Sequence, residues 1–133
     1  MVIDLDKEIA KNMQPLVLAM IGDSVQTLFV RTHIAQKYGV KVNKMNKMVS
    51  SVVRAGSQFL TYKKLEPLFT EEEMFIAKRA RNTHTHSKAK NFSITEYIYA
   101  TALEAVIGYL YLTHQEDRLE LILNTSLEEL VEF

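Results

Sequence analysis

Residues 15–38 read PLVLAMIGDSVQTLFVRTHIAQKY, a long stretch that is apolar nearly all round. The proline at its start suits the first turn of a helix, and Gly39 is a common residue just after a helix end. A surface helix would carry a continuous polar face, whereas Asp23, Gln26 and Arg31 interrupt the stretch too often for a bilayer span. The stretch therefore predicts a long helix that lies in the core.

A second stretch of the same kind lies about eighty residues further along the chain. Residues 94–113 read ITEYIYATALEAVIGYLYLT, and Ser93 with Glu96 matches the capping box that opens many helices. Apolar side chains again occur nearly all round. This stretch is predicted to be a second long, buried helix.

Start and stop signals predict shorter helices in the rest of the chain. Asn43 would cap one of them, and Gly56 would break the chain before the next. Thr70 with Glu73 forms another capping box. The predicted ranges are 43–53, 57–66, 71–82 and a last amphipathic helix from 116 onward.

Residues 83–92 have no helical period and are predicted to be a loop. No segment alternates as a strand does, so the predicted fold is all-α, with about six helices.

The length and composition of the chain narrow the class of protein. With 133 residues it has the length of one domain, so we expect residues 1–133 to form a single domain. The absence of cysteine excludes disulfides, thiolate metal sites and a cysteine nucleophile. Acids near the N-terminus stand where a signal peptide would have lysines. We therefore expect a cytoplasmic protein without a membrane span, and no nucleotide cofactor.

The net charge is zero, but the charges are separated along the chain. Residues 31–65 include eight basic residues and no acid, and residues 78–90 include five more, again without an acid. Acids gather at residues 71–73 and after residue 113. A surface with a basic side would suit an anionic partner such as nucleic acid, although solvated helix faces would give the same pattern.

Each of the two long helices has one carboxylate in the middle of its apolar run, Asp23 in the first and Glu104 in the second. A buried charge is costly unless it is paired, so each acid needs a partner. Gly22 adjoins Asp23, and Gly108 lies one turn after Glu104, so the helices could approach closely and bring both acids to one site. Carboxylates with waters suit Mg²⁺ or Mn²⁺, which can activate a water for attack on phosphorus. The alternative is that the acids only accept hydrogen bonds from nearby hydroxyl groups. The candidate donors are Ser24, Tyr97, Tyr99 and Thr101.

These residues resemble the signature of the ribonuclease III family. Ile21-Gly22-Asp23-Ser24-Val25 is similar to its Leu-Gly-Asp-Ala-Val core, and Leu103-Glu104-Ala105-Val106-Ile107-Gly108 is similar to its second, glutamate-bearing motif. Over residues 16–112 the chain more closely resembles Mini-III, a compact bacterial family that lacks a separate double-stranded-RNA-binding domain. The similar segments also include Thr70-Glu71-Glu72-Glu73, Lys78-Arg79-Ala80-Arg81-Asn82, Lys90-Asn91, Tyr97-Ile98-Tyr99-Ala100-Thr101-Ala102-Leu103-Glu104 and Gly108-Tyr109-Leu110-Tyr111-Leu112.

The resemblance implies a ribonuclease III-like catalytic domain with Asp23 and Glu104 as catalytic residues and metal ligands. It implies an endoribonuclease that uses Mg²⁺, with Mn²⁺ as a substitute, to hydrolyse phosphodiesters in double-stranded RNA and leave 5′-phosphate and 3′-hydroxyl ends. For Mini-III the implied substrate is precursor 23S ribosomal RNA at its paired ends, and the implied state is a homodimer in which each subunit's site addresses one strand. The implied RNA contacts are Arg79, Arg81, Asn82, Lys88, Lys90 and Asn91.

At two positions the chain differs from the larger ribonucleases III, which carry four carboxylates around the metals. Ala19 stands four residues before the first acid, and Thr101 three before the second, where those enzymes have glutamate and aspartate. The missing acids motivate an alternative function, a non-catalytic helical RNA-binding or ribosome-assembly module. A third hypothesis, a phosphohydrolase that uses His84 and His86, lacks a closed set of metal ligands in the sequence.

Overall fold

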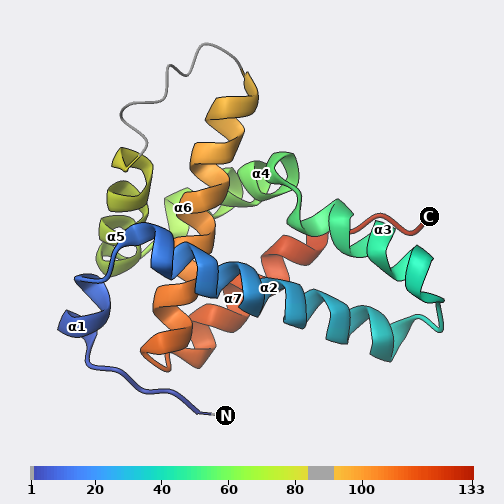
Figure 1. The fold of residues 1–133 in the computed structure, drawn as a ribbon, viewed down its shortest axis with the longest axis horizontal. Coiled ribbons are helices and arrows are strands. Elements are labelled where there is room, and N and C mark those ends of the chain that lie inside the picture. Colours follow the sequence, from blue (N-terminus) through green and yellow to red (C-terminus); the bar gives the residue numbers. More distant parts are fainter. Residues whose placement is uncertain (1, 84–91) are drawn as a thin grey trace.

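The computed structural model describes residues 2–83 and 92–133, and in these ranges the chain forms helices and no strand (Figure 1). The prediction of an all-α fold is confirmed. The α-helices are α1 (Lys7–Lys11), α2 (Pro15–Lys37), α3 (Val42–Val53), α4 (Ala55–Leu65), α5 (Glu71–Asn82), α6 (Phe92–Leu112) and α7 (Glu116–Ser126). Two 3-10 turns follow α4 and α7, namely η1 (Glu66–Leu68) and η2 (Leu127–Glu129).

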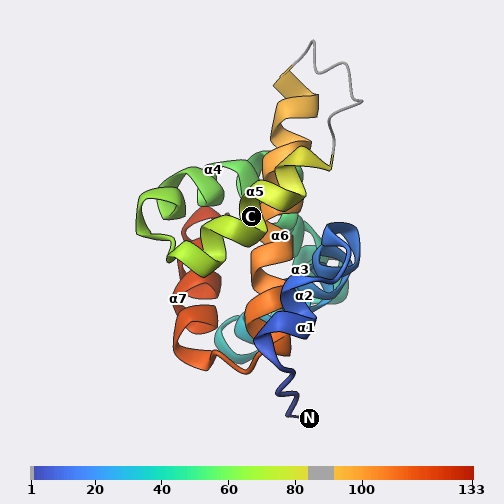
Figure 2. The ribbon, with the colours of Figure 1, turned by 90° about the vertical axis from the view of Figure 1, so that its left-hand side faces the viewer.

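Helix α6 runs through the centre of the molecule. Figures 1 and 2 show α2, α4, α5 and α7 arranged around it, and all four pack against it. Leu103, Val106, Ile107 and Leu110 of α6 are fully buried, because neighbouring helices cover α6 from several sides. The prediction of a long buried helix over residues 94–113 is confirmed.

Helix α2 has the predicted extent, but it is buried on one side only. Its face toward α6 and α3 has buried residues every four positions, the spacing of one side of a helix. They are Leu18, Gly22, Gln26, Val30 and Ile34. On the opposite side, Met20 is 74% and Leu28 67% exposed. The prediction that this helix lies in the core holds for one face only, because the rest of the described chain leaves the opposite face exposed.

The junction between α3 and α4 differs from the prediction. Helix α3 has Lys41 as its N-cap, so Asn43 lies inside the helix and does not cap it. Helix α4 starts directly after Arg54 and includes Gly56. The break therefore falls at Arg54, whose backbone is extended, and not at the glycine. The exact end of a helix depends on local contacts, and a single residue type predicts it only weakly.

Side-chain caps determine other helix ends. The capping box of Thr70 and Glu73 is confirmed, because each side chain accepts a hydrogen bond from the other residue's backbone amide. Helix α6 begins at Phe92, so Ser93 lies inside it and does not precede it as the predicted cap. Helix α1 is an addition to the prediction, and Asp6 caps it by accepting hydrogen bonds from two amides of its first turn.

An ion pair between a buried carboxylate and a half-buried guanidinium group holds α5 to α7. Glu73 is 1% exposed, and its carboxylate accepts hydrogen bonds of 2.7 and 2.8 Å from Arg118. Arg118 also donates to the carbonyl of Leu68 in η1 at 3.0 Å. The sequence shows Arg118 only as one base among acids, so its partner could not be predicted.

The predicted loop at 83–92 lies mostly outside the described residues, and with it His84, His86, Lys88, Lys90 and Asn91. Among the helices of residues 2–83 and 92–133, none is both long and apolar enough to cross a membrane.

Candidate active site

Helices α2 and α6 cross with their backbones in contact, and two glycines make this possible (Figure 1). A Cβ atom on Gly22 would lie 1.7 Å from the carbonyl oxygen of Glu104, and one on Gly108 would lie 2.0 Å from the carbonyl oxygen of Leu18. Neither position has room for any side chain. The predicted close approach of the two helices at Gly22 and Gly108 is confirmed.

The crossing brings the two acids together from different helices. Asp23 directly follows Gly22, and the backbone of Glu104 lies against that glycine. The carboxyl groups are close enough for the charge of Asp23, and a hydrogen bond between the two, to raise the pKa of Glu104. The burial of the acids is unequal, because Asp23 lies on the exposed side of α2 whereas Glu104 is partly buried.

The pKa of Glu104 is raised from 4.5 to about 7. Burial is the largest cause, since it removes water from the charged carboxylate; the hydrogen bond from Gln58 opposes the shift, and Asp23 adds to it. A cation between the two carboxyl groups would offset both the burial and the repulsion. The donor set therefore fits a divalent metal, with Asp23 and Glu104 as protein ligands.

Glu104 has a hydrogen-bond partner that the sequence analysis missed. Gln58 of α4 donates to the Glu104 carboxylate at 3.3 Å and to Gln26 of α2 at 2.8 Å. Gln26 is noticeable in the sequence as a polar residue in an apolar helix, but Gln58 is part of a short polar stretch with no such signal. The contact depends on the packing of α4 against α6, which the sequence does not specify locally.

Two of the four hydroxyl groups considered as partners of the acids donate elsewhere. Ser24 and Thr101 donate to backbone carbonyls one turn earlier in their own helices, at 3.3 and 2.9 Å. Asp23 accepts a hydrogen bond at the long distance of 3.5 Å from Thr27, which was not among the candidates. The structure therefore gives no support to Ser24 or Thr101 as the partner of either acid.

The two positions without a carboxylate lie in the core. Ala19 and Thr101 are both buried. The part of the chain that the structure describes holds no cluster of three or more histidine, cysteine, aspartate or glutamate side chains able to bind a metal. A metal ion held by these two carboxylates would take its remaining ligands from water or from phosphate oxygens of a substrate.

Of the predicted RNA contacts, the structure describes Arg79, Arg81 and Asn82. Arg79 is partly buried, and its guanidinium donates to the carbonyl of Lys11 and, at 3.2 Å, to that of Met13. These bonds hold α5 to the end of α1 and to the connection that follows it. The geometry gives Arg79 a structural role.

Arg81 and Asn82 lie at the end of α5 that leads to the undescribed segment. Arg81 lies over the ring of Tyr99, 5.4 Å from its centroid, and Lys63 of α4 lies 4.6 Å from the same centroid. Asn82 is exposed. Both bases also lie near the carboxylate of Glu66, Arg81 at 3.8 Å and Lys63 at 3.9 Å, so their charge is partly compensated.

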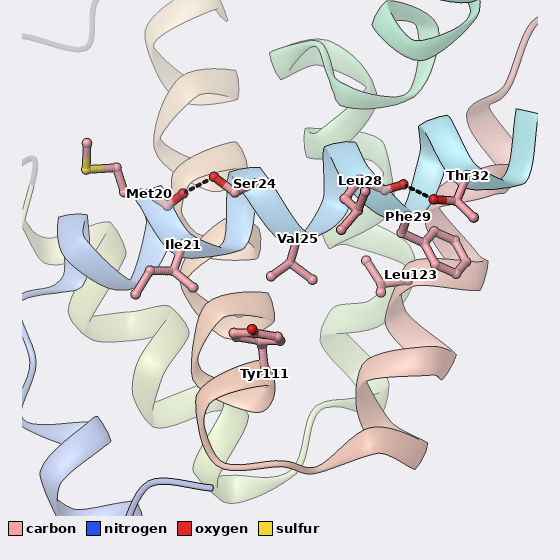
Figure 3. Close-up of a pocket in the computed structure, with 9 residues that line it drawn as sticks. All are labelled: Met20, Ile21, Ser24, Val25, Leu28, Phe29, Thr32, Tyr111 and Leu123. Atoms are coloured by element: carbon pink, nitrogen blue, oxygen red, sulfur yellow. Dashed lines mark hydrogen bonds between the residues drawn. The ribbon is translucent and has the colours of Figure 1, made fainter. Parts of the chain in front are cut away.

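An apolar groove runs along the exposed side of α2 (Figure 3). Its volume is about 730 Å³. Figure 3 shows Ile21 and Val25 of α2 pointing toward Tyr111 of α6, with Leu28 further along the helix. The complete lining is Met20, Ile21, Ser24, Val25, Leu28, Phe29, Thr32, Tyr111 and Leu123. The groove lies on the same helix as Asp23.

The model of the ribonuclease III domain family matches residues 16–115, which is most of the chain. This range includes both helices of the crossing and both acids. The chain therefore belongs to the ribonuclease III family, a class of endoribonucleases that generally depend on divalent metal ions.

Relatives narrow the family further. A Mini-ribonuclease 3 from Clostridium tetani is 43% identical over 121 residues, covering 90% of this chain and 80% of the relative. One from Staphylococcus aureus is 47% identical over 116 residues, covering 86% and 87%. A crystal structure of a protein from Fusobacterium nucleatum has a TM-score of 0.76 and 35% identity, covering 88% of this chain and 93% of that one. The chain is thus an endoribonuclease of the Mini-III family, as its sequence motifs predict.

Proposed function

We propose that this endoribonuclease hydrolyses phosphodiester bonds of double-stranded RNA in a Mg²⁺-dependent reaction, for which Mn²⁺ can substitute. Asp23 and Glu104 are the proposed catalytic residues and metal ligands. The observation that carries the proposal is the glycine crossing of α2 and α6, which sets two carboxyl groups side by side and raises the pKa of one of them. Perturbed carboxyl pairs are typical of functional sites.

The proposed roles of the residues follow from their environments. Bound Mg²⁺ would supply Lewis-acid stabilisation of charge on the phosphate and increase the acidity of the attacking water. Asp23, on the exposed side of α2, is accessible to both metal and substrate. Glu104 is partly buried and binds metal in its ionised form, so metal binding and release of its proton are coupled.

The finer proposal for the substrate is precursor 23S ribosomal RNA, cut where its ends pair into a stem, which places the enzyme in the cytoplasm. A-form RNA is bound through shape and phosphate charge more than through base edges. The proposed contacts are Arg79, Arg81, Asn82, Lys88, Lys90 and Asn91. Because these contacts are with phosphates, affinity for RNA should fall as salt rises, with a slope that grows with the number of contacts.

We also propose a homodimer in which each subunit's site cuts one strand. The groove on α2 supports this, because Met20 and Leu28 expose large apolar side chains that a second copy would cover. A two-fold interface uses the same patch on both subunits, so a single apolar face on each is sufficient.

The test is cleavage of a long, sequence-neutral double-stranded RNA, with Mg²⁺ and with EDTA. We expect cleavage that requires Mg²⁺ and is lost in Asp23→Asn and Glu104→Ala. The control is Glu120→Ala, which removes an exposed acid of α7 and should cut normally. Circular dichroism would verify that each variant is folded.

Two outcomes would contradict the proposal. If Asp23→Asn cut as fast as the parent at saturating Mg²⁺, the catalytic assignment would be wrong. If the parent bound duplex RNA equally with and without EDTA and gave no product, a non-catalytic RNA-binding module would be favoured. A precursor 23S stem and a neutral duplex of equal length, assayed in parallel, would test the finer proposal.

A further inference from the structure

A buried pair of amide side chains lies behind Glu104. Gln58 is 3% exposed and Gln26 is fully buried. The Nε2 group of Gln58 donates to Oε1 of Gln26 at 2.8 Å and to Oε2 of Glu104 at 3.3 Å. The pair thereby connects α4 and α2 to the carboxyl group on α6.

The two hydrogen bonds define the orientation of Gln58. A side-chain amide has two N–H groups, and here one acceptor is available for each. One N–H group of Gln58 donates to Gln26, so the other N–H group is directed at Glu104. Since the two oxygens of a carboxylate point in different directions, a bond to Oε2 also restricts the direction of Oε1.

The stability of the fold does not by itself explain why Gln26 and Gln58 carry amide side chains. The Nε2 group of Gln26 is buried and has no hydrogen-bond partner among the described residues. Burying an unpaired polar group costs free energy, and an apolar side chain of similar size would avoid that cost. A polar side chain at position 26 is useful because its oxygen holds Gln58.

A neutral amide is also a more suitable hydrogen-bond donor to a metal-binding carboxylate than a positively charged side chain would be. A lysine or arginine in place of Gln58 would pair with the Glu104 charge and compete with a cation. An amide orients the carboxylate without neutralising it, which is how groups behind a metal's ligands commonly act.

We infer that Gln58 is a positioning residue that orients the Glu104 carboxylate for metal binding, and that Gln26 holds Gln58 in place. The inference rests on the proposed metal site at Asp23 and Glu104. It concerns how a ligand is held, and it predicts an effect on metal affinity that is separate from RNA binding and from folding.

The main variant is Gln58→Met, which keeps the length of the side chain and removes its donors. Loss of such a partner typically reduces metal affinity about 10- to 100-fold. We expect the Mg²⁺ concentration for half-maximal cleavage to rise by about 10-fold or more, with an unchanged KM for RNA at saturating Mg²⁺. Mn²⁺ binding to the RNA-free protein, followed by electron paramagnetic resonance, should weaken by a similar factor. Gln26→Met should act in the same direction and more weakly.

The matched control is Gln115→Met. Gln115 also donates to a carboxylate, that of Glu72 at 3.2 Å, but in another part of the molecule. This variant should leave both metal measurements at the parent values, even where its melting temperature falls. In the parent protein, the side-chain amide resonances of Gln58 should shift when Mg²⁺ is added and those of Gln115 should not, a readout that needs no variant to fold.

The outcomes separate this inference from the proposed function. If the parent binds Mn²⁺ and cuts RNA, but folded Gln58→Met has the same Mn²⁺ affinity and Mg²⁺ dependence, the inference is wrong and the proposed function stands. An unchanged Gln58 resonance on Mg²⁺ saturation would also overturn it. If the parent neither binds Mn²⁺ nor cuts RNA, the metal site itself is wrong, and the positioning role falls with it.

Discussion

Glu104 owes its chemical environment to three helices. Its backbone lies against Gly22 of α2, its carboxyl group is close to Asp23, and Gln58 of α4 donates to it. Burial and Asp23 favour the protonated form, whereas Gln58 favours the ionised form. The balance leaves the pKa of Glu104 at about 7, so a change in pH around this value alters its charge.

We expect cleavage at low Mg²⁺ to increase as the pH rises through about 7, because ionised Glu104 is the form that would bind the proposed metal. Higher Mg²⁺ should move the midpoint to lower pH, since a bound cation favours the ionised form. Cleavage rates measured across this range at two Mg²⁺ concentrations would test this. A midpoint that does not move with Mg²⁺ would show that another group limits the rate.

The same pKa has a consequence for stability. Because the pKa of Glu104 is raised from 4.5 to about 7, the folded protein binds more protons than the unfolded chain between these values. The stability of the metal-free protein should therefore fall as the pH rises from 4.5 to about 7. Glu104→Gln should reduce this dependence, which thermal melts in EDTA would measure.

At the scale of elements, the contact between α2 and α6 depends on the absence of two side chains. Gly22→Ala should destabilise the fold by about 2 kcal/mol or more, because the new Cβ would meet the Glu104 carbonyl oxygen and push the helices apart. Cleavage should also fall, since the two acids would separate. Gly39→Ala is the control, because a Cβ there has nothing within 4 Å. Equal melting temperatures for the two variants would contradict the close approach.

The attachment of α7 to α5 depends on one buried carboxylate. Arg118→Met should lower the free energy of unfolding by about 3 kcal/mol, because it leaves the charge of Glu73 buried and unpaired. Lys64→Met breaks ion pairs that are more exposed, those with Glu128 and Glu129, and should cost less than about 1 kcal/mol. Urea unfolding of both variants would measure the difference. Similar costs would mean that the burial of Glu73 has little effect.

At the scale of the whole molecule, the groove on α2 is the place where the proposed dimer would form. Leu28→Glu should give a folded monomer, because it puts a charge into an apolar interface. Val42→Glu, at an exposed apolar residue outside the groove, should leave the dimer intact. Light scattering after size exclusion would measure the masses. A Leu28→Glu dimer of unchanged stability would place the interface elsewhere.

Local signals were sufficient to predict much of the site. The two acids stand out because each interrupts an apolar helix, and Gly22 and Gly108 stand out because they lie beside the acids on the helix surface. The structure confirms the close approach of the helices. The metal and catalytic roles of Asp23 and Glu104 stay predictions, as do the RNA contacts and the single domain.

The sequence by itself determined the all-α class, the two long helices, the glycines that leave room for a close crossing and the resemblance to the ribonuclease III family, because these depend on short-range patterns of apolar residues, glycines and acids. Only the tertiary structure decided which face of α2 is buried, which base pairs with Glu73, and which amide reaches Glu104. Each of these depends on a contact between residues far apart in the chain. Such contacts follow from how the helices pack together, and a local pattern does not specify that arrangement.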